Sequence, residues 1–242
     1  MNLFMLRNIK NIVFAFVFGI AGGVFADQIL WPYFIERPLF YKYRLEQPPV
    51  YITEKNEIVV QENTALKDAI EKSEKYLISI KTAIKSGKFM ISSGVIVSSD
   101  GLVVALSETI PQGGAFSLYI NNDEVEGQVL KRDAKGNLSL IKIKGENLTP
   151  AGFADFSSLR LGERVFLLGN LLEKDVFSKT ASEGMVKSFN QEYIKTNISE
   201  DKNLTGSPLF NIKGELLGLN IVDSSGNVSA VPISKIKSFL GF

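Results

Sequence analysis

Hydrophobic and polar positions follow three different patterns along the chain. The first is a long apolar stretch over residues 11–35, in which Asp27 and Gln28 are the main polar interruption. A helix needs about 20 mostly apolar residues to cross the hydrocarbon core of a bilayer. The pattern therefore predicts a transmembrane helix here, with the lipid bilayer as the partner of these residues.

The flanks of this stretch predict its orientation. Arg7 and Lys10 precede it, and Trp31 lies near its end, where aromatic residues often mark a membrane interface. The positive-inside rule then places residues 1–10 in the cytoplasm. A single-pass protein of the cell membrane is predicted, with its C-terminal part outside the cytoplasm, either periplasmic or extracellular.

Two other interpretations of the same stretch stay open. The first is a cleaved signal peptide, because Ile12–Ala26 has the length of its apolar region and Val24 and Ala26 are small residues before a cleavage point. The second is a buried helix of a soluble protein. The anchor is preferred, because the apolar run continues well beyond the cleavage point.

The second pattern is a polar connection followed by a short amphipathic segment. Residues 36–62 contain a Pro-Pro pair and mixed charges, which is typical of a linker. The sequence NTALKDAIEKSEKYL, residues 63–77, predicts a short helix that Asn63 or Thr64 can cap. Its apolar face carries Leu66, Ala69 and Ile70.

The third pattern is a series of short alternating runs with turn signals between them, which predicts β-strands. Six runs precede a connector at about residues 149–161, and nearly as many follow it. The runs cover residues 76–83, 88–98, 101–109, 115–122, 124–133, 138–144, 163–170, 177–189, 193–198, 208–222 and 228–234. This division predicts a mainly β fold of two small antiparallel barrels, at about 76–148 and 160–236, with a ligand cleft between them.

Composition excludes several kinds of chemistry. The net charge of +1 gives no basic face for nucleic acid. The chain has no cysteine, so it has no disulfide and no thiol chemistry. It has no histidine either, which removes the usual general base near neutral pH and the commonest transition-metal ligand. No cofactor and no metal site are predicted.

Four segments together resemble a known family: SSGVIVSSDGLVVA, KRDAKGNLSLIKIK, LRLGERVFLLGN and YIKTNISEDKNLTGSPLFNIKGELLGLNI. They are similar, in order and spacing, to the HtrA-type (Deg) trypsin-like serine proteases over about residues 65–236. The resemblance implies the two-barrel trypsin-like (chymotrypsin) fold over residues 63–242, with a Ser-His-Asp triad in the cleft. Many family members carry an N-terminal anchor and a C-terminal PDZ domain. The chain ends at Phe242, so no PDZ domain is expected.

All three triad positions of the family differ in this sequence. The family's histidine segment, G-x-x-V-T-N-x-H-V, corresponds to GLVVALSETI and places Glu108 at the histidine. The aspartate segment corresponds to GNLSLIK and places Asn137 at the aspartate. The nucleophile segment matches YIKTNISEDKNLTGSPL without a gap and places Thr205 at the serine.

These replacements remove the chemistry of the triad. An imidazole normally takes the hydroxyl proton, and a carboxylate holds the resulting cation. Glu108 is a poor base for Thr205, because a glutamate has a reference pKa of about 4.3. Asn137 is neutral, and the methyl group of Thr205 crowds an attacking oxygen.

The loop around the nucleophile position is altered as well. The resemblance assigns the oxyanion-hole positions to Asn203, Leu204 and Thr205, with Asn203 replacing a glycine whose backbone turns its N–H inward. It assigns the binding cleft to Asn197, Gly206 and Ser207.

Three functions follow as hypotheses. The first is a membrane-anchored pseudoprotease that binds an extended peptide or an envelope protein, for example by strand addition. The second is a peptidase that uses Thr205 with a base other than histidine, such as Glu108 or a lysine; Lys202 lies three residues before Thr205. The third is a structural envelope protein. Because the family often forms trimers, a homo-oligomer is a further option.

Overall fold

The computed structural model describes residues 3–36, 64–84, 87–145, 147–174 and 176–242. Contacts between residues divide the chain into two units, Met1–Val59 and Val60–Phe242. The linker predicted over 36–62 lies almost wholly outside the described residues. Each unit is described by itself.

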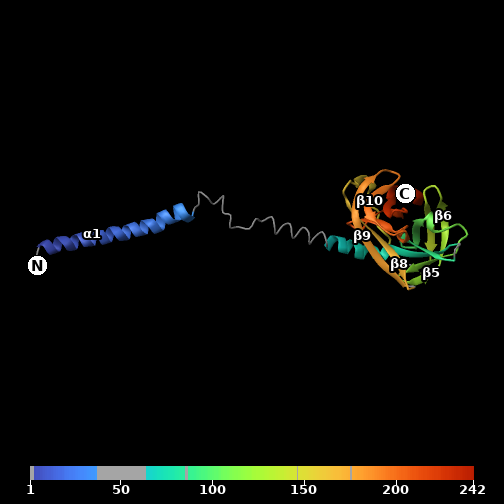
Figure 1. The fold of residues 1–242 in the computed structure, drawn as a ribbon, viewed down its shortest axis with the longest axis horizontal. Helices are drawn as coiled ribbons and strands as arrows, with labels where there is room; N and C mark the ends of the chain where they lie inside the picture. Colours follow the sequence, from blue (N-terminus) through green and yellow to red (C-terminus); the bar gives the residue numbers. More distant parts are fainter. Residues whose placement is uncertain (1–2, 37–63, 85–86, 146, 175) are drawn as a thin grey trace. The chain divides into compact units, whose positions relative to one another are not determined.

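The first unit contains the predicted apolar helix. Helix α1 covers Leu3–Phe25, and the π-helical segment η1 covers Ala26–Glu36 (Figure 1). Within them, Lys10–Trp31 is long and apolar enough to cross a membrane. Within the described residues, no side chain of this span is buried.

The second unit begins with the predicted short helix, observed over residues 64–73 and followed by the 3₁₀ turn η3, Glu74–Tyr76. Its predicted apolar face is confirmed. Ala69 is buried, and Leu66 and Ile70 pack against the same core cluster, which also contains Phe210.

The first group of strands forms a seven-stranded antiparallel sheet in the order β5-β4-β1-β2-β3-β7-β6. Figure 1 labels its two end strands, β5 and β6. The strands are β1 Leu77–Ala83, β2 Phe89–Ile96, β3 Leu102–Leu106, β4 Phe116–Ile120, β5 Asp123–Val125, β6 Gly127–Asp133 and β7 Leu138–Ile143. Its interior is lined by buried aliphatic side chains, among them Ile80 and Ile141.

The second group closes into a six-stranded barrel, in the order β10-β13-β12-β11-β8-β9. The strands are β8 Arg164–Glu173, β9 Val176–Phe189, β10 Ile194–Ser199, β11 Pro208–Asn211, β12 Leu216–Val222 and β13 Asn227–Pro232. Leu167 and Leu209 belong to its core. The mainly β fold predicted from the strand pattern is therefore confirmed.

One core cluster joins the two halves of this unit. Phe166 of β8 and Phe210 of β11 stack with their ring centroids 5.4 Å apart. The same cluster contains Leu106 of the first sheet and Ile236 near the C-terminus. The two halves therefore share buried apolar contacts and hold the segments between them in fixed positions.

The first half departs from the prediction of a closed barrel. The single strand expected over residues 124–133 is two strands, β5 and β6, which pair with different neighbours. A side chain at Gly127 would place a Cβ only 2.4 Å from Leu118 Cδ1, so glycine allows the chain to bend there. The result is a half-barrel in which β6 pairs with β7 alone among the described strands.

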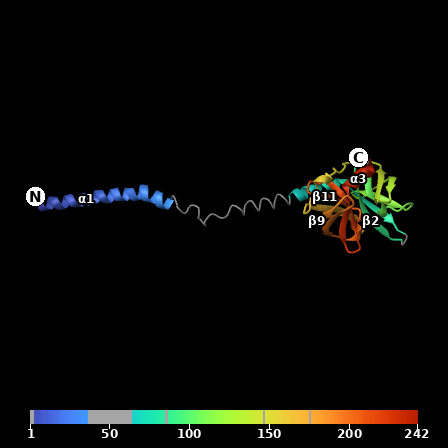
Figure 2. The same cartoon turned by 90° about the horizontal axis from the view of Figure 1, so that it is seen from above.

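A second departure lies at the C-terminus. The strand predicted over 228–234 ends at Pro232, and helix α3, Ile233–Leu240, follows (Figure 2). Ile233, Ile236 and Phe239 are its buried residues, at helical spacing. Gly241 ends the helix with φ 94°, a left-handed conformation that glycine adopts without strain.

Candidate functional site

Glu108 and Asn137 form a reciprocal hydrogen-bonded pair. The backbone N–H of Glu108 donates to Asn137 Oδ1 at 2.9 Å, and Asn137 Nδ2 donates to Glu108 Oε1 at 3.0 Å. The N–H of Ser107 also donates to the backbone oxygen of Asn137 at 3.0 Å. The Glu108 carboxylate is thus held by an amide, not directed at a hydroxyl.

The strand register explains why these two residues meet. Strands β3 and β7 are neighbours, and Leu106 at the end of β3 pairs with Leu138 at the start of β7. The residues just outside that pair therefore come together. Asn137 takes the left-handed conformation there with φ 55°, which asparagine adopts more readily than most residues.

Thr205 lies in a loop of the second barrel, directly after the 3₁₀ turn η6, Lys202–Leu204. It is 8% exposed, and its Oγ1 accepts a hydrogen bond from the N–H of Val222 in β12 at 3.3 Å. Among the described residues, the Thr205 hydroxyl forms this hydrogen bond alone. Neither Glu108 nor Lys202 bonds to it, and Lys202 is exposed.

The backbone donors of this loop are engaged within the loop itself. The N–H of Asn203 donates to Asp201 Oδ1 at 2.8 Å. The N–H groups of Leu204 and Thr205 donate to the carbonyl oxygens of Asp201 and Lys202, both at 3.0 Å. A pair of N–H groups can stabilise an oxyanion only if both point toward it. In this conformation the loop offers no such pair.

Gly206 and Ser207 fix the loop against the first sheet. Gly206 has φ 90°, its N–H donates to Asn220 O at 2.7 Å, and a Cβ there would lie 2.7 Å from the backbone oxygen of Ser93 in β2. Ser207 is fully buried, and its Oγ accepts from Asn220 Nδ2 at 3.2 Å. Ser207 therefore has no surface with which to contact a ligand in this conformation.

Asn197 has a different setting. It lies on the exposed face of β10, and its Oδ1 accepts from the N–H of Met185 in β9 at 2.7 Å. The structure therefore brings Glu108 to Asn137 and places Thr205 beside Gly206 and Ser207, but it uses Asn197 to hold two strands together.

Several polar groups behind the loop were not anticipated from the sequence. The side-chain oxygens Ser92 Oγ, Ser93 Oγ and Asn220 Oδ1 are buried and have no hydrogen-bond partner in the part of the chain that the structure describes. In the sequence, the adjacent residues Ser92 and Ser93 within the otherwise apolar run of β2 could have indicated buried polar groups. Among the described residues, no group of three acidic side chains is placed to hold a metal ion.

Comparison with known proteins places this geometry in context. The family model described as "Trypsin-like peptidase domain" matches residues 92–219. This segment contains the Glu108–Asn137 pair and the loop of Thr205.

Curated relatives agree with the family match. The chain is 26% identical over 139 residues to "Probable periplasmic serine endoprotease DegP-like" of Pseudomonas putida, covering 54% of this chain and 28% of that protein. It is 29% identical over 160 residues to "Serine protease HTRA1A" of Danio rerio and 31% identical over 160 residues to "Serine protease HTR4" of Rattus norvegicus, in each case covering 61% of this chain and 33% of the relative. The chain thus spans about a third of the length of the curated relatives that it matches.

Proposed function

The chain belongs to the trypsin-like peptidase family, and from that premise we propose that it is a member without peptidase activity, acting as a binding module. The observation that carries this proposal is the state of the Thr205 hydroxyl. It accepts a bond from the Val222 N–H, while the Glu108 carboxylate is bonded to Asn137. A weak nucleophile of this kind needs a base within hydrogen-bond reach.

The closed loop supports the same proposal. Because the N–H groups of Asn203 and Thr205 are bonded within the loop, a tetrahedral oxyanion would lack donors. Loss of one such donor alone costs a peptidase roughly 100- to 1,000-fold in kcat. A missing base and missing donors together leave little of the mechanism.

We place the module outside the cytoplasm, anchored in the cell membrane by the apolar helix. The span Lys10–Trp31 and the basic residues Arg7 and Lys10 support this orientation. The DegP-like relative is periplasmic by name, which is consistent with it. The ligands proposed are extended peptides and proteins of the cell envelope.

A library experiment tests the proposal directly. The full chain, purified in detergent, is incubated with casein and with a random decapeptide library, and both are analysed by mass spectrometry. The proposal predicts intact casein and a set of retained, uncut peptides. Peptide fragments with a consistent cleavage site would contradict the loss of activity, and a library with no enriched member would contradict binding.

A further inference from the structure

Strand β6 stands at one end of the first sheet and β5 at the other. Among the described strands β6 pairs with β7 only, so its other edge is free. An unpaired strand edge presents a row of backbone donors and acceptors to an incoming strand. At about 3.3 Å per residue, the seven residues of β6 offer an edge of roughly 20 Å.

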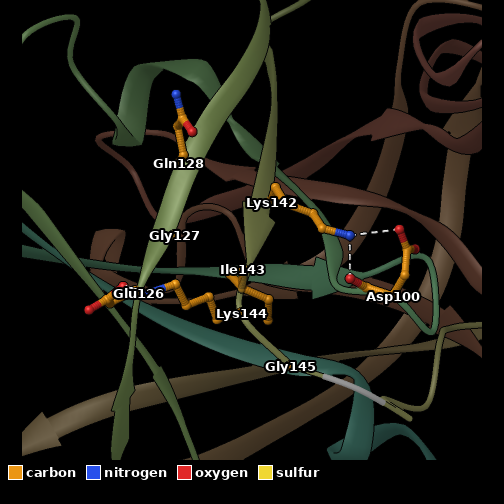
Figure 3. A pocket seen from close by; sticks show the side chains of 8 residues that line it. All are labelled: Asp100, Glu126, Gly127, Gln128, Lys142, Ile143, Lys144 and Gly145. Atoms are coloured by element: carbon orange, nitrogen blue, oxygen red, sulfur yellow. Dashed lines mark hydrogen bonds and ion pairs between the residues drawn. The ribbon is translucent and has the colours of Figure 1, made fainter.

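Surface hollows follow this strand along its length. A hollow of about 660 Å³ lies at its start, between Glu126–Gln128 and the end of β7 (Figure 3). A second hollow, of about 410 Å³, separates residues 129–132 from the loop that contains Gly113. A third, of about 640 Å³, continues past Lys131 and Arg132 toward α3. The hollow beside residues 129–132 has no lining residue from β7, so the unpaired edge of β6 faces open space there.

One exposed apolar side chain and several basic side chains lie beside the free edge of β6. Leu130 is 54% exposed at a bulge of β6. Lys131 Nζ donates to the backbone oxygen of Phe239 at 2.7 Å, and the Arg132 guanidinium donates to the backbone oxygen of Ile110. Within the described part of the chain, neither Lys131, Arg132 nor the nearby Lys135 forms an ion pair with an acid.

The acidic groups at the same end of β6 are already occupied. Asp133 Oδ1 accepts the backbone N–H groups of Lys135 and Gly136, both at 3.0 Å. Glu192 is paired with Lys235. The charges at the start of β6 are paired as well: Lys142 with Asp100, and Lys144 with Glu126 (Figure 3). Among the described residues Asp133 has no ion-pair partner, so this one acid beside three cations leaves the C-terminal end of β6 with a net positive charge.

We propose that β6 is a docking strand for an extended peptide segment that carries acidic side chains beside apolar ones. The segment adds to the free edge through main-chain hydrogen bonds, which is a common mode of peptide recognition. Its acidic side chains meet Lys131, Arg132 and Lys135, and an apolar side chain covers Leu130. This proposal rests on the proposed binding function, and it locates the peptide away from the closed loop of Thr205.

The test uses three fluorescent nonapeptides and the full chain in detergent, with fluorescence anisotropy as the measurement. The first peptide alternates valine with glutamate, the second has lysine in place of glutamate, and the third is the first with alternate backbone nitrogens methylated. The proposal predicts binding of the first peptide and at least tenfold weaker binding of the other two. Equal binding of the methylated peptide would overturn strand addition.

Two protein variants locate the binding surface. Leu130→Asp with Lys135→Glu should weaken binding of the glutamate peptide at least tenfold, because it places acidic groups beside the edge. Lys213→Glu, in the β11–β12 turn, repeats the charge change of Lys135→Glu elsewhere and should leave binding unaltered. Circular dichroism checks that both variants are folded, and Lys135→Glu alone serves if the double variant is not. If peptide binding survives the substitutions in and beside β6, the docking assignment fails while the binding function stands. If no library peptide binds at all, the proposed function itself fails.

Discussion

The sequence resemblance aligns Glu108 and Asn137 with the histidine and aspartate of the family's triad. In a working triad the pair at these positions holds a cation, whereas here a carboxylate accepts from an amide. The hydrogen bonds are as well formed as a relay would need, with lengths of 2.9 and 3.0 Å. The pair therefore contributes to the shape of the site without contributing a base.

This pairing predicts how Asn137→Asp behaves. The new carboxylate would face the carboxylate of Glu108, and like charges raise the pKa of one of them. A group with a raised folded-state pKa stabilises the fold at low pH and loses that contribution as the pH rises through the raised value. We expect the variant to be less stable than the natural protein at pH 7, by about 1 kcal/mol, with the difference shrinking toward about pH 4.

Thermal unfolding as a function of pH measures this effect. Glu108→His with Asn137→Asp is the matched control, since it replaces the like charges by a pair that attracts when the histidine is protonated. A deficit of Asn137→Asp that is the same at pH 4 and pH 7 would show that charge repulsion is not its cause.

Gly206 offers a second prediction at this scale. Its φ of 90° disfavours any side chain, and a Cβ would lie 2.7 Å from the Ser93 backbone oxygen. Gly206→Ala is expected to destabilise the fold by about 2–4 kcal/mol. Gly152→Ala is the control, because a Cβ there meets nothing within 4 Å. Similar unfolding midpoints for the two variants in urea would refute the tight packing of the loop.

At the scale of elements, the alternation of apolar residues predicted most strands. Alternate residues of a strand with one buried face are apolar, so the sequence indicates which residues face the core. The alternation did not predict the bend at Gly127, since apolar and polar residues alternate on both sides of it. It did not predict helix α3 either. Its three buried positions follow directly after a strand, and a short helix is hard to separate from a strand end by periodicity.

The sequence predicted only part of the candidate site, for a similar reason. Glu108, Asn137 and Thr205 were predicted from the resemblance to the family's motifs, and the structure brings the first two together. The bonds to Asp201 and Lys202 are local to the η6 loop, whereas two further bonds join the loop to β12: Gly206 N–H to Asn220 O, and Val222 N–H to Thr205 Oγ1. The bonds to β12 are set by the tertiary fold, so no local pattern in the sequence encodes them.

The β12–β13 hairpin carries a prediction about acid. Asp223 accepts bonds from the Asn227 side chain at 2.9 Å, the Asn227 N–H at 2.9 Å and the Ser225 N–H at 2.8 Å. These bonds, that of the Asn227 side chain first, lower the pKa of the Asp223 carboxyl. A lowered pKa gives stability that is present above the ordinary carboxyl range and is lost as the pH falls through the folded-state value.

We therefore expect Asp223→Asn to lose less stability than the natural protein as the pH falls below about 4. Thermal unfolding at several pH values is the measurement. Asp123→Asn, at the exposed start of β5, is a control of the same chemistry. If the natural protein and Asp223→Asn show parallel acid profiles, the carboxylate does not stabilise this turn.

At the scale of the whole molecule, the chain combines an apolar helix with a β unit that has its own buried cores. If the helix is an anchor, the full chain should sediment with membranes and resist extraction by alkaline carbonate. A variant lacking residues 1–36 should appear in the soluble fraction. A full-length chain that is found in the soluble fraction would contradict the anchor, and a shortened mature N-terminus would support a cleaved signal peptide instead.

The central claim is that the family's fold persists here without its catalyst. The most direct measurement is labelling of the full chain in detergent with a fluorophosphonate probe, followed by mass spectrometry of the peptide that contains Thr205. The rebuilt variant Glu108→His, Asn137→Asp, Asn203→Gly and Thr205→Ser is the control. The account predicts no adduct on the natural chain and an adduct on the rebuilt one. A covalent adduct on Thr205 of the natural chain would contradict it.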